Sequence, residues 1–196
     1  MNKNQILAAG AVLLLLVGLG SFRFFRSPSG TSNTAPLPAL FDVKNMSYVV
    51  GSETFKLVDG VATKEYAPGS AIKNKLRLFG DPVYGDLDGD GDTDAAVLLQ
   101  NEPGGSGTFY YAALVINNGG STYTPTKAML LGDRIAPQVI EIRDGRAGYF
   151  FAERRANEPM STPPSWGRSV LVHYDKKTGD IGEWVKGFEG ESNLPK

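Results

Sequence analysis

The sequence predicts an all-β domain, an antiparallel meander that forms a sandwich or a partly open barrel, preceded by an N-terminal hydrophobic helix. Three observations support this prediction. The chain of 196 residues contains 24 Gly and 12 Pro, a composition that is typical of many turns between short strands. After residue 40, apolar and polar residues alternate, and no apolar period of a helix is evident. A single long apolar run stands at the N-terminus.

The apolar run Ile6–Gly20 follows Lys3, and its length is at the short edge for a helix that spans a bilayer. It also fits the core of a signal peptide, with small residues at Gly18 and Gly20 near a cleavage site. The aromatic segment Phe22–Phe25 is typical of an anchor at the membrane interface. We interpret residues 1–26 as a signal peptide or a transmembrane signal anchor and favour the anchor. Either would place the domain outside the cytoplasm, in the periplasm or at the cell surface, membrane-anchored or secreted.

Residues 27–40 are uncharged and rich in Ser, Thr and Pro. Such a segment cannot build a core, so it predicts a flexible linker and a folded β-domain over residues 41–196. The formal net charge is -1, and residues 1–26 are basic, so the domain itself is mildly acidic. It therefore offers no basic field for nucleic acid. The absence of Cys excludes disulfides, thiol nucleophiles and Cys-ligated metals.

About ten strands are expected from the alternation and from the turns between apolar segments. Asp59-Gly60 and Asp144-Gly145 are two-residue hairpin signals, which predict that the strands on either side of each turn pair with one another. The strands that the alternation defines are residues 53–58, 61–66, 75–79, 94–100, 108–117, 139–143, 148–153, 169–174 and 181–185.

In two of these strands, residues 94–100 and 108–117, both alternating faces are apolar. A strand with one face in water carries polar residues at every second position. We therefore expect these two strands to be central, covered on both faces, and paired as a hairpin through the Gly-rich segment between them.

The loop Asp86–Asp94 carries the motif with the most specific chemistry, Asp-x-Asp-x-Asp-Gly-x-x-Asp. Oxygen ligands at this spacing can converge on one Ca²⁺, and Gly91 permits the sharp turn. No Lys or Arg occurs from Leu78 to Thr126, so a divalent ion would relieve a repulsion that nearby residues in the sequence do not. An acidic turn without metal is the alternative. The expected ligands are the carboxylates of Asp86, Asp88, Asp90 and Asp94 and the backbone carbonyl of Asp92.

Val97 stands where an EF-hand has its bidentate Glu, and the flanking segments are predicted strands. With the apolar strand after it, the loop resembles the calcium loop of FG-GAP/VCBS-type repeats, a loop of the dockerin and EF-hand type. A single copy is present, which does not fit a propeller of many blades. A wider stretch, including Gly85–Val97, Gly104–Tyr111, Leu131–Arg134 and Glu158–Met160, is similar to exported bacterial proteins without an assigned activity. This resemblance implies an extracytoplasmic location and no particular reaction.

Other candidate residues have simpler interpretations. His173, the only histidine, is expected to be an edge-like strand residue without a catalytic role. Gly104–Gly107 precedes a strand and lacks the Lys-Ser/Thr of a phosphate loop, so a hairpin turn is expected. The charged groups Asp133-Arg134 and Glu153–Arg155 are expected to be solvated or locally paired. The aromatic residues Trp166, Trp184, Tyr110 and Tyr111 either pack in the core or form a sugar-binding platform.

The sequence leaves three classes of function open. The first is a non-enzymatic domain of the cell envelope with one structural Ca²⁺ loop that binds a protein or a glycan. The second is an envelope hydrolase that uses acidic residues, because carboxylate pairs meet only in space. The third is a purely structural or regulatory module.

Overall fold

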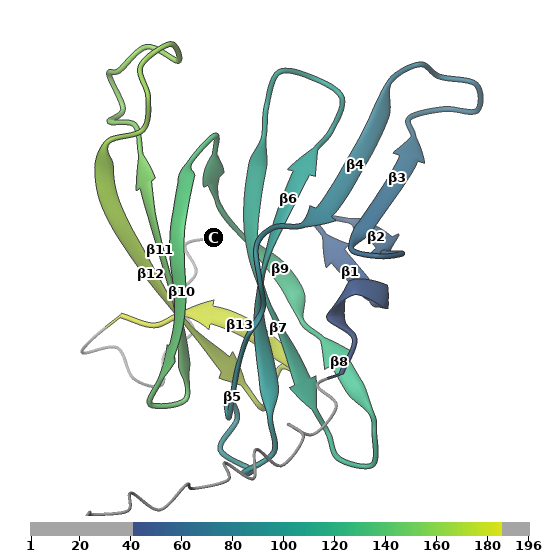
Figure 1. Ribbon diagram of the computed structural model, residues 1–196, viewed down its shortest axis with the longest axis vertical. Helices are drawn as coiled ribbons and strands as arrows, with labels where there is room; N and C mark the ends of the chain where they lie inside the picture. The colour runs from purple at the N-terminus through teal and green to yellow at the C-terminus, as the bar shows by residue number, and fades with distance from the viewer. Residues whose placement is uncertain (1–40, 186–196) are drawn as a thin grey trace, which may run out of the picture. The chain divides into compact units, whose positions relative to one another are not determined.

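The computed structural model describes residues 41–185 (Figure 1). The predicted signal peptide or anchor, residues 1–26, and the predicted linker, residues 27–40, lie outside the described residues. Within residues 41–185, no helix is long and apolar enough to cross a membrane. The elements of this range are the 3₁₀ helix η1 (Val43–Asn45) and the strands β1 (Ser47–Val50), β2 (Glu53–Lys56), β3 (Val61–Glu65), β4 (Lys73–Leu78), β5 (Val83–Gly85), β6 (Asp94–Glu102), β7 (Phe109–Asn117), β8 (Tyr123–Pro125), β9 (Lys127–Asp133), β10 (Ala136–Arg143), β11 (Arg146–Glu153), β12 (Trp166–Asp175) and β13 (Asp180–Glu183).

The strands form two sheets, so the prediction of an all-β fold is confirmed. In the larger sheet the order is β2-β1-β9-β7-β6-β4-β3, with β5 added to β6 and β8 added to β7. A bridge between Val58 and Val61 joins the two ends of this order, so the seven strands form a nearly closed barrel. The smaller sheet, β10-β11-β12-β13, is antiparallel throughout and stands beside the barrel in Figure 1. The architecture is a barrel plus a sheet, and it departs from a simple antiparallel meander because β1 and β9 run parallel.

The two strands with apolar residues on both faces, β6 and β7, pair as the predicted hairpin at the centre of the molecule. In β6, Ala95, Val97 and Leu99 belong to the core cluster inside the barrel. Ala96 and Leu98 point the other way, into the core cluster between the barrel and the smaller sheet. Each face of the hairpin therefore has its own core, which is why neither face could be polar.

The prediction that the strands on either side of Asp59-Gly60 pair with one another is wrong, although the turn itself forms. Both residues have the positive φ of a two-residue hairpin turn, 51° and 81°. The turn closes one bridge, between Val58 and Val61, and then the chains diverge, because β2 pairs with β1 and β3 pairs with β4. The turn lies where the barrel closes, and long-range pairing on each side overrides the local signal.

The other hairpin signal, Asp144-Gly145, joins β10 to β11 as predicted, with Arg143 opposite Arg146. Four strands have no counterpart among those expected from the alternation: β1, β5, β8 and β9. Strands β5 and β8 have three residues each, too few to show a period of two. The short strand β5 leads directly into the aspartate loop, so it fixes where that loop leaves the sheet.

One polar contact joins the smaller sheet to the central hairpin. The hydroxyl of Tyr149 on β11 is fully buried and donates to the backbone carbonyls of Val97 on β6 and Ala113 on β7, at 3.1 Å each. Burial raises the pKa of Tyr149 above its usual value. The two carbonyl acceptors satisfy the buried hydroxyl, so this aromatic side chain fills the interface without leaving an unpaired polar atom there.

Candidate metal centre

The aspartate loop connects β5 to β6, and the ladder between these strands holds both of its ends. Gly85, the last residue of β5, is directly opposite Asp94, the first residue of β6. The chain therefore leaves and re-enters the sheet at adjacent positions. Gly89 and Gly91 have φ values of 78° and 90°, a conformation that a side chain would oppose. This is the local reason why the loop can turn back on itself.

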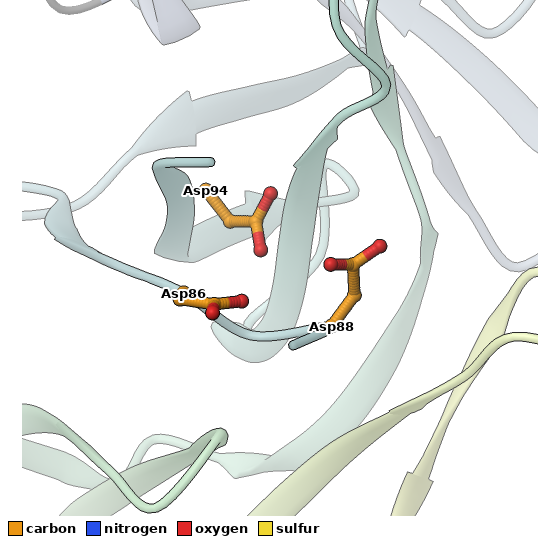
Figure 2. Close-up of side chains that lie close together, drawn as sticks. All are labelled: Asp86, Asp88 and Asp94. Carbon is orange, nitrogen blue, oxygen red and sulfur yellow. The ribbon is translucent and has the colours of Figure 1, made fainter. Parts of the chain in front are cut away.

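Three carboxylates converge inside the loop (Figure 2). One oxygen each from Asp86, Asp88 and Asp94 lies within 4.8 Å of the others. The Asp86 carboxylate is held in place by backbone N–H groups, since Oδ1 accepts from Gly89 at 2.6 Å and Oδ2 accepts from Gly91 at 3.1 Å. The backbone of the loop thus holds the Asp86 carboxylate in position without the help of a bound ion.

Asp94 is the buried member of the group. Its Oδ2 accepts from the backbone N–H of Leu87 at 2.7 Å, and its Oδ1 accepts from that of Asn117 at 2.8 Å. Burial raises the pKa of Asp94, and the charges of Asp88 and Asp90 act in the same direction, while the two backbone donors oppose the shift. A cation beside this carboxylate would stabilise its ionised form.

The other two predicted ligand residues are not part of this group of three. Asp90 and Asp92 are exposed, and Asp90 Oδ1 accepts from the backbone N–H of Asp92 at 2.8 Å. The Asp92 carboxylate faces the turn after β7, where Oδ2 would lie 3.9 Å from a Cβ added to Gly119. A side chain that faces away from the cluster is compatible with the prediction for Asp92, which assigned the metal contact to its backbone carbonyl.

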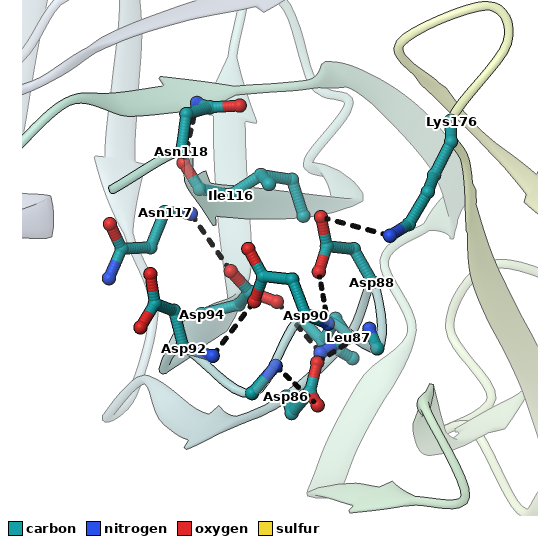
Figure 3. Close-up of polar contacts among 12 residues, drawn as sticks. Asp86, Leu87, Asp88, Asp90, Asp92, Asp94, Ile116, Asn117, Asn118 and Lys176 are labelled. Atoms are coloured by element: carbon teal, nitrogen blue, oxygen red, sulfur yellow. Dashed lines mark hydrogen bonds and ion pairs between the residues drawn. The ribbon is translucent and has the colours of Figure 1, made fainter. Parts of the chain in front are cut away.

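A lysine from the other sheet reaches the cluster (Figure 3). Lys176, in the turn between β12 and β13, places its Nζ 3.7 Å from Oδ2 of Asp88. The lysine side chain is 57% exposed and that of Asp88 is 12% exposed. Sequence reasoning found no cation near the loop because Lys176 is far away along the chain. The structure brings it there by packing the end of the smaller sheet beside the loop.

The donor set fits a hard divalent cation. Carboxylate and carbonyl oxygens are the ligands that Ca²⁺ and Mg²⁺ prefer, and the converging residues include neither Cys nor His. Three aspartates close together could therefore hold a metal ion of this class.

His173 lies on β12 opposite Gly182 of β13. β12 lies between β11 and β13 in the smaller sheet, so it is not an edge strand as expected, although its ladder with β11 ends at Val172, one residue before His173. The Nδ1 atom of His173 is buried and has no hydrogen-bond partner among residues 41–185. The absence of a catalytic role for this residue stays a prediction.

The aromatic residues considered for a sugar platform do not share one surface. Tyr110 belongs to the core between the sheets and Tyr111 packs against the barrel core, on the opposite face of β7. Trp166 is 50% exposed on β12, with the guanidinium of Arg155 at 4.5 Å from its ring centre. The guanidinium of Arg146 lies 4.3 Å from the ring centre of Trp184.

The two carboxylates considered for acid–base chemistry each have an arginine partner. Asp133 forms an ion pair with Arg134 at 2.6 Å, and its Oδ1 also accepts from the backbone N–H of Thr108. The hydrogen bond from Arg134 lowers the pKa of Asp133, and the Thr108 amide and the positive charge of Arg154 add to this effect. Oε2 of Glu153 lies 3.2 Å from Nη1 of Arg168. The local pairing predicted for Asp133-Arg134 is confirmed, whereas the arginine beside Glu153 comes from β12 and is neither Arg154 nor Arg155.

The chain matches no family model, no curated protein and no solved structure.

Proposed function

We propose that this β-domain binds Ca²⁺ in the loop Asp86–Asp94. The observation that carries the proposal is the convergence of three carboxylates, from Asp86, Asp88 and Asp94, within a glycine-bent loop. In the proposed site, the carboxylate of Asp90 and the backbone carbonyl of Asp92 complete the oxygen ligands after a small movement of the loop. A calcium loop of this kind tolerates such adjustment because Ca²⁺ accepts 6–8 oxygen ligands in flexible geometry.

The proposed role of the ion is structural. Asp94 is both a member of the cluster and the first residue of β6, the strand that separates the two cores. An ion that fixes the loop would fix the entry of this strand. Within residues 41–185 the loop is not flanked by a pair of helices, so a calcium-driven opening of the EF-hand kind is not part of the proposal.

We place the domain outside the cytoplasm, as a binding module of the cell envelope whose partner is a protein or a glycan. The apolar run Ile6–Gly20, the linker of residues 27–40 and a loop suited to a calcium-rich compartment support this placement. The module is favoured over an envelope hydrolase because Asp133 and Glu153 are each engaged by an arginine. The hydrogen bond from Arg134 lowers the pKa of Asp133, so this carboxylate is not poised as a general acid.

The test of binding is a calorimetric titration of the full-length protein, freed of metal by a chelator, with CaCl₂. We expect a single site with Kd of roughly 10⁻⁴–10⁻³ M, the range of extracellular modules, because Val97 stands where an EF-hand has its bidentate Glu. MgCl₂ serves as the comparison, because Mg²⁺ demands a stricter octahedral geometry and should bind more weakly. The absence of a calcium heat at protein concentrations that suit this range would leave only an acidic turn.

The test of location is separate. An alkaline-phosphatase reporter fused after Leu40 is active only when it is exported, so the proposed placement predicts an active fusion. The control is the same fusion without residues 1–26, which should be inactive. A fusion that is produced at full length but is inactive would contradict the placement and would leave the calcium proposal untouched.

A further inference from the structure

A cavity of about 130 Å³ lies between the barrel and the smaller sheet, away from the aspartate loop. Lower along the same interface the two layers touch closely, since a Cβ added to Gly85 would lie 3.0 Å from Ile142 on β10. Towards the start of β10 the interface is less tightly filled, and the cavity is bordered by Phe79–Asp81 on one side and by Pro137–Ile140 on the other. We call it the interface cavity.

The inner wall of the interface cavity is apolar. Leu98, Leu131, Ile135 and Phe151 line it and are each at most 6% exposed. Tyr149 lines it as well, but its hydroxyl is committed to carbonyls of β6 and β7 and so does not make the wall polar. Protein interiors leave few voids larger than a water molecule, and an apolar cavity of about 150 Å³ is dry and takes up benzene. The interface cavity has the size and the lining for one six-membered ring.

The mouth of the interface cavity is polar and carries an unpaired negative charge. Asp81 and Gln138 line the cavity and are exposed. No ion pair within 4.0 Å involves Asp81 in the part of the chain that the structure describes. No Lys or Arg is among the residues that line the cavity. The guanidinium groups of Arg77 and Arg168 lie 6.0 Å from the ring centres of Phe79 and Phe151, and each is paired with a glutamate. A ligand with an apolar ring and a positive charge would therefore fit the cavity, with its ring against the apolar inner wall and its charge beside Asp81 at the mouth.

The strand at the mouth is unsuited to pairing with a peptide strand. The ladder between β10 and β11 shifts register between Pro137 and Val139, so Gln138 is an extra residue in a bulge. Proline and bulges are features that protect strand edges from pairing with another chain. Bulges also occur beside binding sites, where they redirect side chains. A small molecule is therefore a better occupant than an added strand.

We infer that the interface cavity binds a small one-ring amine, with the ring between the two sheets and the ammonium group beside Asp81. This site is independent of the proposed calcium loop, and neither requires the other.

Benzylamine, toluene and benzoate are suitable probes, because they share a ring and differ in charge. Calorimetric titration and saturation-transfer NMR on the full-length protein at neutral pH should rank their affinities as benzylamine, then toluene, then benzoate. Asp81→Asn should weaken benzylamine binding about two- to fivefold, the worth of one exposed ion pair, and leave toluene binding unchanged. Equal affinities for the three probes, or no binding of benzylamine, would overturn the inference.

A pair of variants on β9 tests the location. Leu131→Phe adds volume to the wall of the cavity and should weaken benzylamine binding by about tenfold or more, whereas Leu130→Phe alters the neighbouring residue, which is 54% exposed and does not line the cavity. If Leu131→Phe does not fold, Val139→Phe at the mouth provides the same comparison. Binding that survives the bulky variant at the cavity as well as the one at Leu130 would show that the amine binds elsewhere.

Discussion

Asp94 is the aspartate of the loop whose carboxylate is buried. It is fully buried, and both of its oxygens accept backbone N–H groups, from Leu87 and Asn117. These contacts hold the carboxylate in position, while burial raises its pKa and so disfavours its charge. The chain retains an acidic group here at a cost in desolvation, and a bound cation is the simplest physical compensation for that cost.

The remaining aspartates should differ in their importance for calcium. Asp88→Asn removes a converging charge that is largely buried, and it should weaken Ca²⁺ binding about tenfold or more. Asp92→Asn changes an exposed side chain that faces Gly119 and keeps the backbone carbonyl, so its effect should stay within about threefold. Calorimetric titration of both variants measures the contrast. An equal loss in the two variants would contradict the assignment of ligand atoms.

Asp133 gives a prediction for acid pH. Its pKa is lowered, with the hydrogen bond from Arg134 as the largest cause, so the folded state binds a proton there less readily than the unfolded chain. The stabilisation is therefore present above the usual value of 3.8 and is lost as the pH falls through the lowered pKa. Denaturant unfolding between about pH 5 and pH 2 should show a steeper loss of stability in the native protein than in Asp133→Asn. Parallel curves would mean that the ion pair is not maintained in solution.

At the scale of elements, the central hairpin β6–β7 could be predicted because its signal is local and continuous. Nine-residue strands with two apolar faces need cover on both sides, and this requirement is visible in the residues themselves. The positions of β1 and β9 could not be predicted, because their parallel pairing joins segments far apart in the chain. The turn at Asp59-Gly60 illustrates the same limit, since its geometry was predictable and its partners were not.

The candidate site also has a part that could be predicted from the sequence and a part that could not. The spacing of the aspartates and the bend at Gly91 follow from the motif, so the loop was predictable. The donors to Asp94 from Asn117 and the approach of Lys176 come from β7 and from the turn after β12. These partners depend on how the sheets pack, and no local pattern in the sequence predicts them.

The contact of Tyr149 with the central hairpin provides a prediction at this scale. Tyr149→Phe keeps the ring in the interface and removes the donor to the carbonyls of Val97 and Ala113. Loss of this buried hydrogen bonding should cost about 1–3 kcal/mol of unfolding free energy, measured by chemical denaturation. Tyr174→Phe is the matched control, because the hydroxyl of Tyr174 has no hydrogen bond to any residue in the range 41–185. A loss of the same size in both variants would mean that the effect is not due to the hydrogen bonds.

At the scale of the whole molecule, an ion pair at the aspartate loop connects the barrel to the smaller sheet. The loop belongs to the barrel, and Lys176 comes from the turn between the last two strands of the smaller sheet (Figure 3). Because the Lys176 side chain is 57% exposed and its Nζ lies 3.7 Å from Asp88, this ion pair contributes little to stability by itself. Calcium would bring two positive charges to the same carboxylates, so it would compete with Lys176 while fixing the loop more firmly.

The central claim is that calcium stabilises the folded domain through the cluster of Asp86, Asp88 and Asp94. With Kd of roughly 10⁻⁴–10⁻³ M, millimolar Ca²⁺ adds about 0.4–1.4 kcal/mol, which corresponds to a rise in Tm of a few degrees. The most direct measurement is thermal unfolding of the full-length protein in millimolar Ca²⁺ and in chelator, for the native chain, for Asp88→Asn and for Asp81→Asn, an acidic residue outside the cluster. The account predicts that calcium raises Tm in the native protein and in Asp81→Asn and leaves Asp88→Asn unchanged. Identical Tm values for the native protein in calcium and in chelator would contradict it.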